Sequence, residues 1–144
     1  MVDLEAIFPG LHDSTYQITS PSTGDYNCIA WAAGDVGRWW WPDLAGKRYW
    51  PAGVPRDETV AAFQDAFHTL GFVVCAGDGL EPGVEKIALF ADDEGPQHAA
   101  RQLPNGRWTS KLGELEDIEH TLRELEGVDY GKVVAVMQRP NSRP

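Results

Sequence analysis

The chain has 144 residues and carries 12 Lys and Arg against 22 Asp and Glu, a formal net charge of −10. This charge argues against binding to nucleic acid or to an anionic membrane surface, and no apolar stretch approaches the length of a membrane span. The length fits a single domain, 1–144, with a core of its own. An acidic N-terminus without a signal-peptide core favours a cytoplasmic location, unless a dedicated secretion system exports the protein.

Residues 1–24 are expected to form an irregular leader that wraps the domain. A helix is predicted over 25–34, because a polar run that offers capping side chains precedes an apolar turn closed by Gly34. Residues 39–51 combine aromatic residues with Pro and Gly and show no regular period, which predicts loop.

Two longer helices are predicted from apolar residues at helical spacing, one over 57–70 and one over 114–126. Short apolar or alternating runs predict strands at 72–75, 84–91, 97–103, 107–112 and 132–138. The tail, 139–144, is expected to be frayed. Because the helices and strands are segregated along the chain, the pattern favours an α+β fold. This fold has an N-terminal helix carrying Cys28, a second helix, and a mostly antiparallel sheet with one further helix.

Cys28 is the candidate nucleophile, since it stands at the start of the first predicted helix. A helix N-terminus presents free N–H groups and a partial positive charge, both of which favour a thiolate. The competing interpretation is a small buried hydrophobe, which is how unpaired cysteine usually behaves. Cys75 ends an apolar run and is expected to be a core residue.

A reactive thiol needs a histidine, and His98 opens a predicted strand. The next strand offers a polar partner for it, and the length of the turn at 104–106 decides which one. A three-residue turn places Ser110 on the face of His98, whereas a two-residue turn places Thr109 there. Ser110 is the first choice. A hydrogen-bonded structural histidine is the alternative for His98.

Four short phrases of the sequence support a resemblance to known proteins: Asn-Cys-Ile-Ala-Trp-Ala, Glu-Lys-Ile-Ala-Leu-Phe, His-Ala-Ala-Arg-Gln-Leu and Trp-Thr-Ser-Lys-Leu-Gly. They resemble a family of bacterial proteins of unknown function and span residues 27–113. The order of a cysteine on a helix, a histidine on a strand and a polar residue on the following strand resembles the papain-like superfamily, with the compact NlpC/P60-type cell-wall peptidases nearest in layout.

This resemblance implies that Cys28 is the nucleophile and His98 the base. The start of the predicted helix can supply N–H donors for the oxyanion, that of Cys28 among them, with Asn27 or Tyr26 as the candidate to complete this site. The sequence departs from the family pattern in two ways: no carboxylate follows His98 in the hairpin, and no glutamine stands a few residues before Cys28. These departures leave an inactive relative as an alternative. No cofactor is expected, and the scattered His and Cys residues predict no metal site.

The aromatic region, with Trp39, Trp40, Trp41, Tyr49 and Trp50, suggests a surface for substrate, although aromatic residues also favour cores. Candidate substrate contacts are Trp31, Trp50 and Trp108. The leading hypothesis is a thiol peptidase or amidase that cleaves an amide bond in a peptide-like substrate. The alternative is a non-catalytic acidic binding or immunity-type module that neutralises a basic protein partner.

Overall fold

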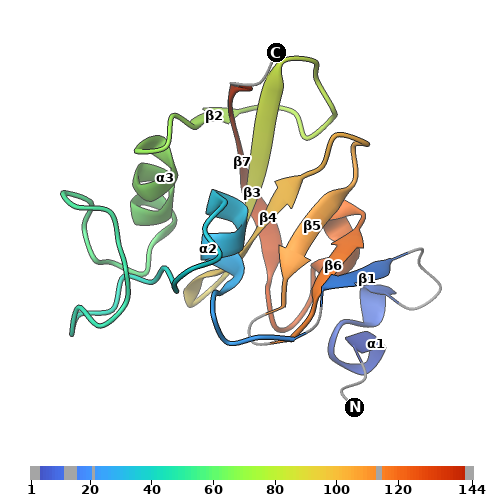
Figure 1. The fold of residues 1–144 in the computed structure, drawn as a ribbon, viewed down its shortest axis with the longest axis horizontal. Helices are drawn as coiled ribbons and strands as arrows, with labels where there is room; N and C mark the ends of the chain where they lie inside the picture. Colours follow the sequence, from blue (N-terminus) through green and yellow to red (C-terminus); the bar gives the residue numbers. More distant parts are fainter. Residues whose placement is uncertain (1–3, 12–15, 21, 113–114, 142–144) are drawn as a thin grey trace.

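The computed structural model describes residues 4–11, 16–20, 22–112 and 115–141. They form an α+β fold around a seven-stranded sheet in which all neighbouring strands pair antiparallel, in the order β1-β6-β5-β4-β3-β7-β2 (Figure 1). The strands are β1 (Gln17–Ser20), β2 (Val73–Cys75), β3 (Val84–Asp92), β4 (Gly95–Gln102), β5 (Trp108–Lys111), β6 (Asp117–His120) and β7 (Lys132–Pro140). The helices are α1 (Leu4–Ile7), α2 (Cys28–Ala33), α3 (Val60–His68) and the 3-10 turns η1 (Pro9–Leu11) and η2 (Leu122–Leu125).

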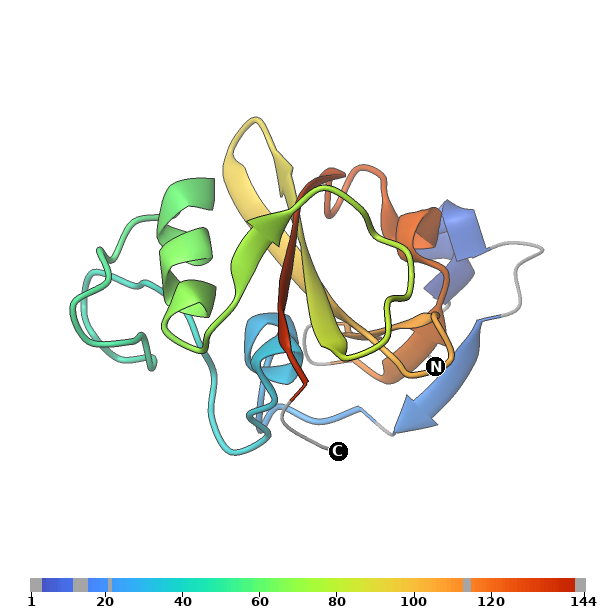
Figure 2. The same ribbon diagram turned by 90° about the horizontal axis from the view of Figure 1, so that it is seen from above.

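Each face of the sheet carries its own hydrophobic core. Ile87, Leu89 and Ala99 belong to the first core, on the face covered by α2 and α3. Their neighbours Ala88, Phe90 and Ala100 belong to the second core, on the face covered by α1, η1 and η2. This alternation follows from the two-residue period of a strand. Figures 1 and 2 show α3 and α1 at opposite ends of the molecule, with α2 lying against the sheet between them.

Local signals explain the two helices of the first core. Asn27 caps α2 by accepting the Ala30 N–H, and Gly34 ends the helix in the left-handed conformation at φ 86°. Thr59 caps α3 by accepting the Ala62 N–H. The predicted loop at 39–51 is confirmed: the described residues between α2 and α3 contain only an isolated bridge between Trp40 and Tyr49.

The predicted helix over 114–126 is wrong. Within its described part, residues 117–120 form β6 and residues 122–125 form η2. The apolar residues fit a helical spacing, but Ile118 and His120 also alternate as a strand does, and pairing with β5 satisfies the backbone of this segment. Thr121 then starts η2 with a capping box completed by Glu124.

The two chain ends are more regular than expected. The predicted irregular leader contains α1, η1 and the edge strand β1, and Leu4, Phe8 and Leu11 are buried against the second core. At the other end, β7 continues to Pro140, and the Asn141 N–H donates to the Gly83 carbonyl. Residues 1–3, 12–15, 21 and 142–144 of these two predicted segments lie outside the described part.

Strands β4 and β5 separate along their length, and this separation positions the candidate site. They pair only at Arg101 with Thr109 and at Gln102 with Trp108. Beyond this point β5 stays paired with β6, while β4 stays paired with β3. Helix α2 packs over the separation and contacts both strands. No helix within the described residues is both long and apolar enough to cross a membrane.

Candidate functional site

Cys28 is the first residue of α2, where the sequence places it, and only 7% of its surface is exposed. The preceding residue fixes this end of the helix. The side-chain Oδ1 of Asn27 accepts the backbone N–H groups of Ala30 and Trp40, both at 3.1 Å. The side-chain Nδ2 donates to the Trp40 backbone carbonyl at 2.8 Å. Asn27 therefore serves as a helix cap and as a tether to the aromatic loop, and its proposed part in an oxyanion site would compete with these bonds.

The Cys28 sulfur lies against strand β4. Burial raises the pKa of the Cys28 thiol to about 11, although the backbone N–H of Ala99, those at the start of α2 and the charge of Lys111 all favour the thiolate. Desolvation thus outweighs the helix N-terminus, and Cys28 is a thiol at neutral pH.

His98 is fully buried on the other face of the sheet, where its neighbours are aromatic and polar. Its ring stacks on Tyr130 with 4.0 Å between centroids, and its Nε2 lies 2.9 Å from Ser110 Oγ. Burial, together with the nearby His120, lowers the pKa of His98 well below its ordinary value. His98 Nδ1 is buried without a hydrogen-bond partner among the described residues.

A chain of hydrogen bonds continues from Ser110. Its hydroxyl oxygen lies 2.7 Å from His120 Nε2, and His120 Nδ1 lies 2.6 Å from the Thr121 carbonyl oxygen. Burial lowers the pKa of His120 to about 4, so both imidazoles are neutral at pH 7.

The direction of this chain assigns the protons. A carbonyl oxygen only accepts, so His120 Nδ1 donates to Thr121, and the neutral ring then accepts at Nε2 from the Ser110 hydroxyl. The Ser110 oxygen in turn accepts from His98 Nε2–H. His98 Nδ1 is therefore left with a free lone pair.

The described contacts include no hydrogen bond between Cys28 and His98. The two residues lie on opposite faces of the sheet. Helix α2, which carries Cys28, covers the face of Ala99, while the His98 ring packs with Phe90 and Tyr130 on the other face. The sulfur approaches at the separation of β4 and β5, however, and the N–H that it accepts belongs to the peptide bond joining His98 to Ala99. The sulfur thus contacts the backbone directly after His98, the residue whose side chain begins the buried chain of hydrogen bonds.

The turn at 104–106 decides the partner of His98. Gln102 pairs with Trp108, as a three-residue turn requires, so Ser110 lies on the face of His98. Thr109 lies on the opposite face, where its hydroxyl accepts the Trp31 indole N–H at 3.1 Å.

The three tryptophans proposed to contact substrate differ in exposure. Trp31 is half-buried and stacks on Tyr26. Trp50 and Trp108 are buried in the first and second core, and the Trp50 indole N–H donates to the Pro55 carbonyl. Only Trp31 keeps a partly open surface near Cys28.

Two members of the buried chain escaped the sequence analysis. His120 falls within the segment predicted as a helix over 114–126, whereas it is fully buried on β6. Tyr130 follows η2 and was not singled out, yet its ring lies flat on His98. The alternation of Ile118 and His120 before a capping threonine was the available signal for a strand. No comparable local signal marks Tyr130. Within the described residues, no group of three or more His, Cys, Asp or Glu is arranged to hold a metal ion.

The fold and the site define an α+β protein with a seven-stranded antiparallel sheet and a buried polar chain beside a sequestered cysteine. The chain belongs to the family described as a domain of unknown function (DUF7689), whose model matches residues 17–138. The match covers Cys28, His98, Ser110 and His120, and it confirms the expected likeness to a family of unknown function; it gives no indication of a papain-like or NlpC/P60 relationship. No curated protein and no solved structure matches the chain.

Proposed function

We propose that this protein is a thiol hydrolase in which Cys28 attacks an amide carbonyl and His98 is the general base, in a papain-like layout. One observation carries the proposal: the chain from Thr121 through His120 and Ser110 leaves a lone pair on His98 Nδ1, and Cys28 Sγ accepts the backbone N–H of Ala99, the residue that follows His98. Burying an imidazole nitrogen without a hydrogen-bond partner lowers the stability of the fold, and a catalytic role would account for its presence.

The protonation states define the first step. Cys28 is a thiol and His98 a neutral imidazole, so the proton moves to His98 Nδ1 while sulfur bonds to the carbonyl carbon. Ser110 Oγ stabilises the imidazolium by accepting from Nε2–H. The N–H groups at the start of α2 face the developing oxyanion.

The later steps return the proton. The imidazolium gives its proton to the amide nitrogen as the C–N bond breaks, which releases an amine and leaves a thioester on Cys28. Water then attacks this thioester, with His98 again as base, and releases a carboxylic acid and the free thiol. Substrate would approach Cys28 from the side of Trp31, because this ring is the part-exposed surface next to the thiol.

The test is the pH dependence of iodoacetamide labelling of Cys28 in a Cys75→Ser background. If His98 removes the proton during attack, the labelling rate is nearly flat between pH 6.5 and 8.5 and falls at least about tenfold in His98→Gln. Ser110→Ala weakens the effect by freeing the His98 ring, whereas Thr109→Ala, on the opposite face of the same strand, leaves the profile unchanged. Rates that rise about tenfold per pH unit toward pH 11, alike in the parent protein and in His98→Gln, would overturn the proposal.

The burial of Cys28 favours a second candidate, a non-catalytic acidic module that binds a basic protein. A cysteine with 7% exposure and a pKa of about 11 is what a structural residue shows, and the net charge of −10 suits a basic partner. For this candidate, we expect the rate of Cys28 labelling to rise about tenfold per pH unit, equally in the parent protein and in His98→Gln.

A further inference from the structure

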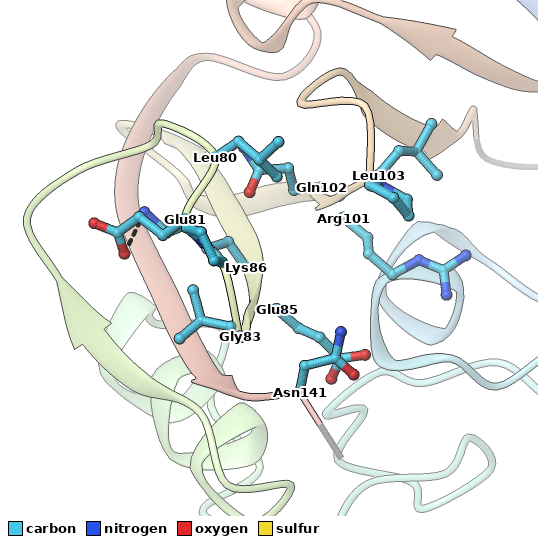
Figure 3. Close-up of a pocket in the computed structure, with 12 residues that line it drawn as sticks. Leu80, Glu81, Gly83, Glu85, Lys86, Arg101, Gln102, Leu103 and Asn141 are labelled. Atoms are coloured by element: carbon cyan, nitrogen blue, oxygen red, sulfur yellow. Dashed lines mark ion pairs between the residues drawn. The ribbon is translucent and has the colours of Figure 1, made fainter. Parts of the chain in front are cut away.

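A cleft of about 610 Å³ lies between the 80–86 segment and the end of β4 (Figure 3). Its lining does not include His98, Ser110 or His120. Its walls come from the start of β3, the turn after β4 and Asn141, which directly follows β7. A smaller hollow beside the end of α2 shares Glu85, Arg101 and Gln102 with it. Arg101 therefore stands where the two hollows meet.

The other charged residues of the cleft already have partners. Lys86 Nζ lies 3.3 Å from Glu81 and donates to the Gly77 carbonyl. Glu85 binds Arg139 at 2.6 Å. Each of these pairs joins opposite charges, so Arg101 is the charged residue among those lining the cleft that has no ion pair in the described part of the chain.

Arg101 itself has no ion pair and no side-chain hydrogen bond among the described residues. Its Nε is buried and unpartnered, and its guanidinium lies over the Trp31 ring at 4.8 Å. Figure 3 shows the guanidinium extending toward α2, on the side of the cleft away from Lys86. Burial lowers the pKa of Arg101 although Glu85 and Asp117 oppose this effect, so the surroundings hold the cation at a cost in solvation.

We propose that this cleft is a binding site for a carboxylate carried on an apolar body, with Arg101 as the anion-binding residue. A guanidinium presents two parallel N–H donors that match the two oxygens of a carboxylate, and the Trp31 ring beneath it holds the plane in place. Leu80, Leu103 and Pro104 offer apolar walls for the rest of the ligand. The site stands whether or not Cys28 is reactive, because Arg101 and the apolar walls take no part in the proposed proton transfer or attack; Trp31 is the residue shared with the proposed approach of substrate.

The position of Arg101 gives such a ligand a consequence for Cys28. Arg101 lies two residues after Ala99 on β4 and on the same face of the sheet, and Trp31 lies one turn after Cys28 on α2. If the proposed hydrolase activity holds, a ligand anchored here would extend along β4 toward the thiol, and the substrate class would be amides that bear a carboxylate.

The test is a titration of the full chain with 3-phenylpropanoate, followed by amide and indole NMR shifts, with neutral 3-phenylpropanamide as the matched probe. We expect saturable shifts at the Trp31 indole and at residues 101–104 with the carboxylate and no saturation with the amide. Arg101→Gln should weaken binding at least about tenfold, and Arg101→Lys should weaken it several-fold because an ammonium lacks the planar pair of donors.

Arg48→Gln is the control, since Arg48 also lies over a tryptophan, Trp39, at 4.8 Å but outside the cleft. It should bind the carboxylate as the parent does. Equal binding of the amide, or undiminished carboxylate binding in an Arg101→Gln protein with native amide spectra, would overturn the proposal. Because the readout is binding, a failure here is distinct from a failure of Cys28 to react.

Discussion

His98 and His120 show how burial fixes the state of a titratable residue. Both rings are enclosed, and each bond along the chain to Thr121 suits the neutral form of His120 and the neutral form of His98. Protonation of His120 would place two donors against the Ser110 hydroxyl and the Thr121 carbonyl, and it would add a charge that the interior does not solvate. The same enclosure that orients His98 thus makes the fold sensitive to acid.

We predict that the free energy of unfolding falls as the pH drops from about 6.5 to about 4. In this interval the unfolded chain binds a proton at His120, with an ordinary pKa of 6.5, while the folded chain binds it only near 4. The stability that His120 contributes is therefore complete above pH 6.5 and lost on the way to pH 4, a loss on the order of 3 kcal/mol. Urea unfolding at a series of pH values measures it.

Two observations separate this effect from the titration of carboxylates in the same range. The His120→Gln variant should show a shallower fall in stability between pH 6.5 and 4 than the parent protein. The imidazole resonances of His120 in the native parent should stay those of a neutral ring down to about pH 4. A native His120 that titrates near 6.5 would contradict the prediction even if the variant does not fold.

At the scale of elements, α2 depends on Asn27 more than on its own length. A helix of six residues is too short to be stable alone, and the Asn27 side chain joins its first turn to the backbone of Trp40 through both carbonyl and N–H. The position of Cys28 at the separation of β4 and β5 follows from this junction.

We predict that Asn27→Ala lowers the free energy of unfolding by about 2–4 kcal/mol, because it removes the cap and leaves buried polar groups of Trp40 unpaired. Asn105→Ala is the matched control: its carbonyl also accepts a backbone N–H, from Arg107, but in an exposed turn, and its loss should cost less than about 1 kcal/mol. Chemical denaturation of the two variants tests the difference. Equal losses would show that Asn27 does not hold α2 in place.

The sequence predicted those elements whose local signals agree with their packing. The spacing of Phe63 and Phe67 marks α3 without reference to other segments, although the helix begins at Val60, after the Thr59 cap, and not at the predicted residue 57. The segment after β5 was mispredicted because its four apolar residues fit a helix equally well, and only pairing with β5 and β1 selects the strand. An edge strand such as β1 is defined by its partner, and its own sequence of four residues carries little signal.

In the candidate site too, the sequence predicts the features that depend on local patterns and misses those that depend on distant contacts. A cysteine at a helix start, a histidine on a strand and a serine across a hairpin follow from local patterns and turn length. The stacking of Tyr130 on His98 joins two segments that are far apart in the sequence. The hydrogen bond from Ser110 to His120 involves a residue of the segment that the sequence wrongly predicts as a helix. The burial that raises the pKa of Cys28 depends on the whole core, and no local pattern reports it.

At the scale of the molecule, the second core is closed by the N-terminal segment. Leu4, Phe8 and Leu11 cover the face of the sheet that holds His98, and η1 packs on η2. The family match begins at residue 17, so residues 4–11, which form this N-terminal cover of the second core, lie outside the matched region. The buried state of the polar chain therefore depends partly on a segment that the family model does not include.

Gly10 allows the cover to be loosened by one substitution. A Cβ at this position would stand 2.2 Å from the Glu124 carbonyl oxygen, which belongs to the backbone of η2 and has little room to move. We predict that Gly10→Ala pushes η1 away from η2 and lowers the free energy of unfolding by about 1–3 kcal/mol. In hydrogen exchange followed by mass spectrometry, peptides covering 4–11 and 122–125 should lose protection, while β3 and β7 keep theirs.

Gly77→Ala is the matched control, since a Cβ there meets nothing within 4 Å. It should leave stability and exchange close to those of the parent. If Gly10→Ala exchanges like the parent, the N-terminal segment tolerates the added methyl group and its fit against η2 is looser than the contact implies. If protection is lost across β3 and β7 as well, the cover and the sheet unfold as one cooperative unit. The burial of His98 would then depend on the segment through global stability rather than through local shielding.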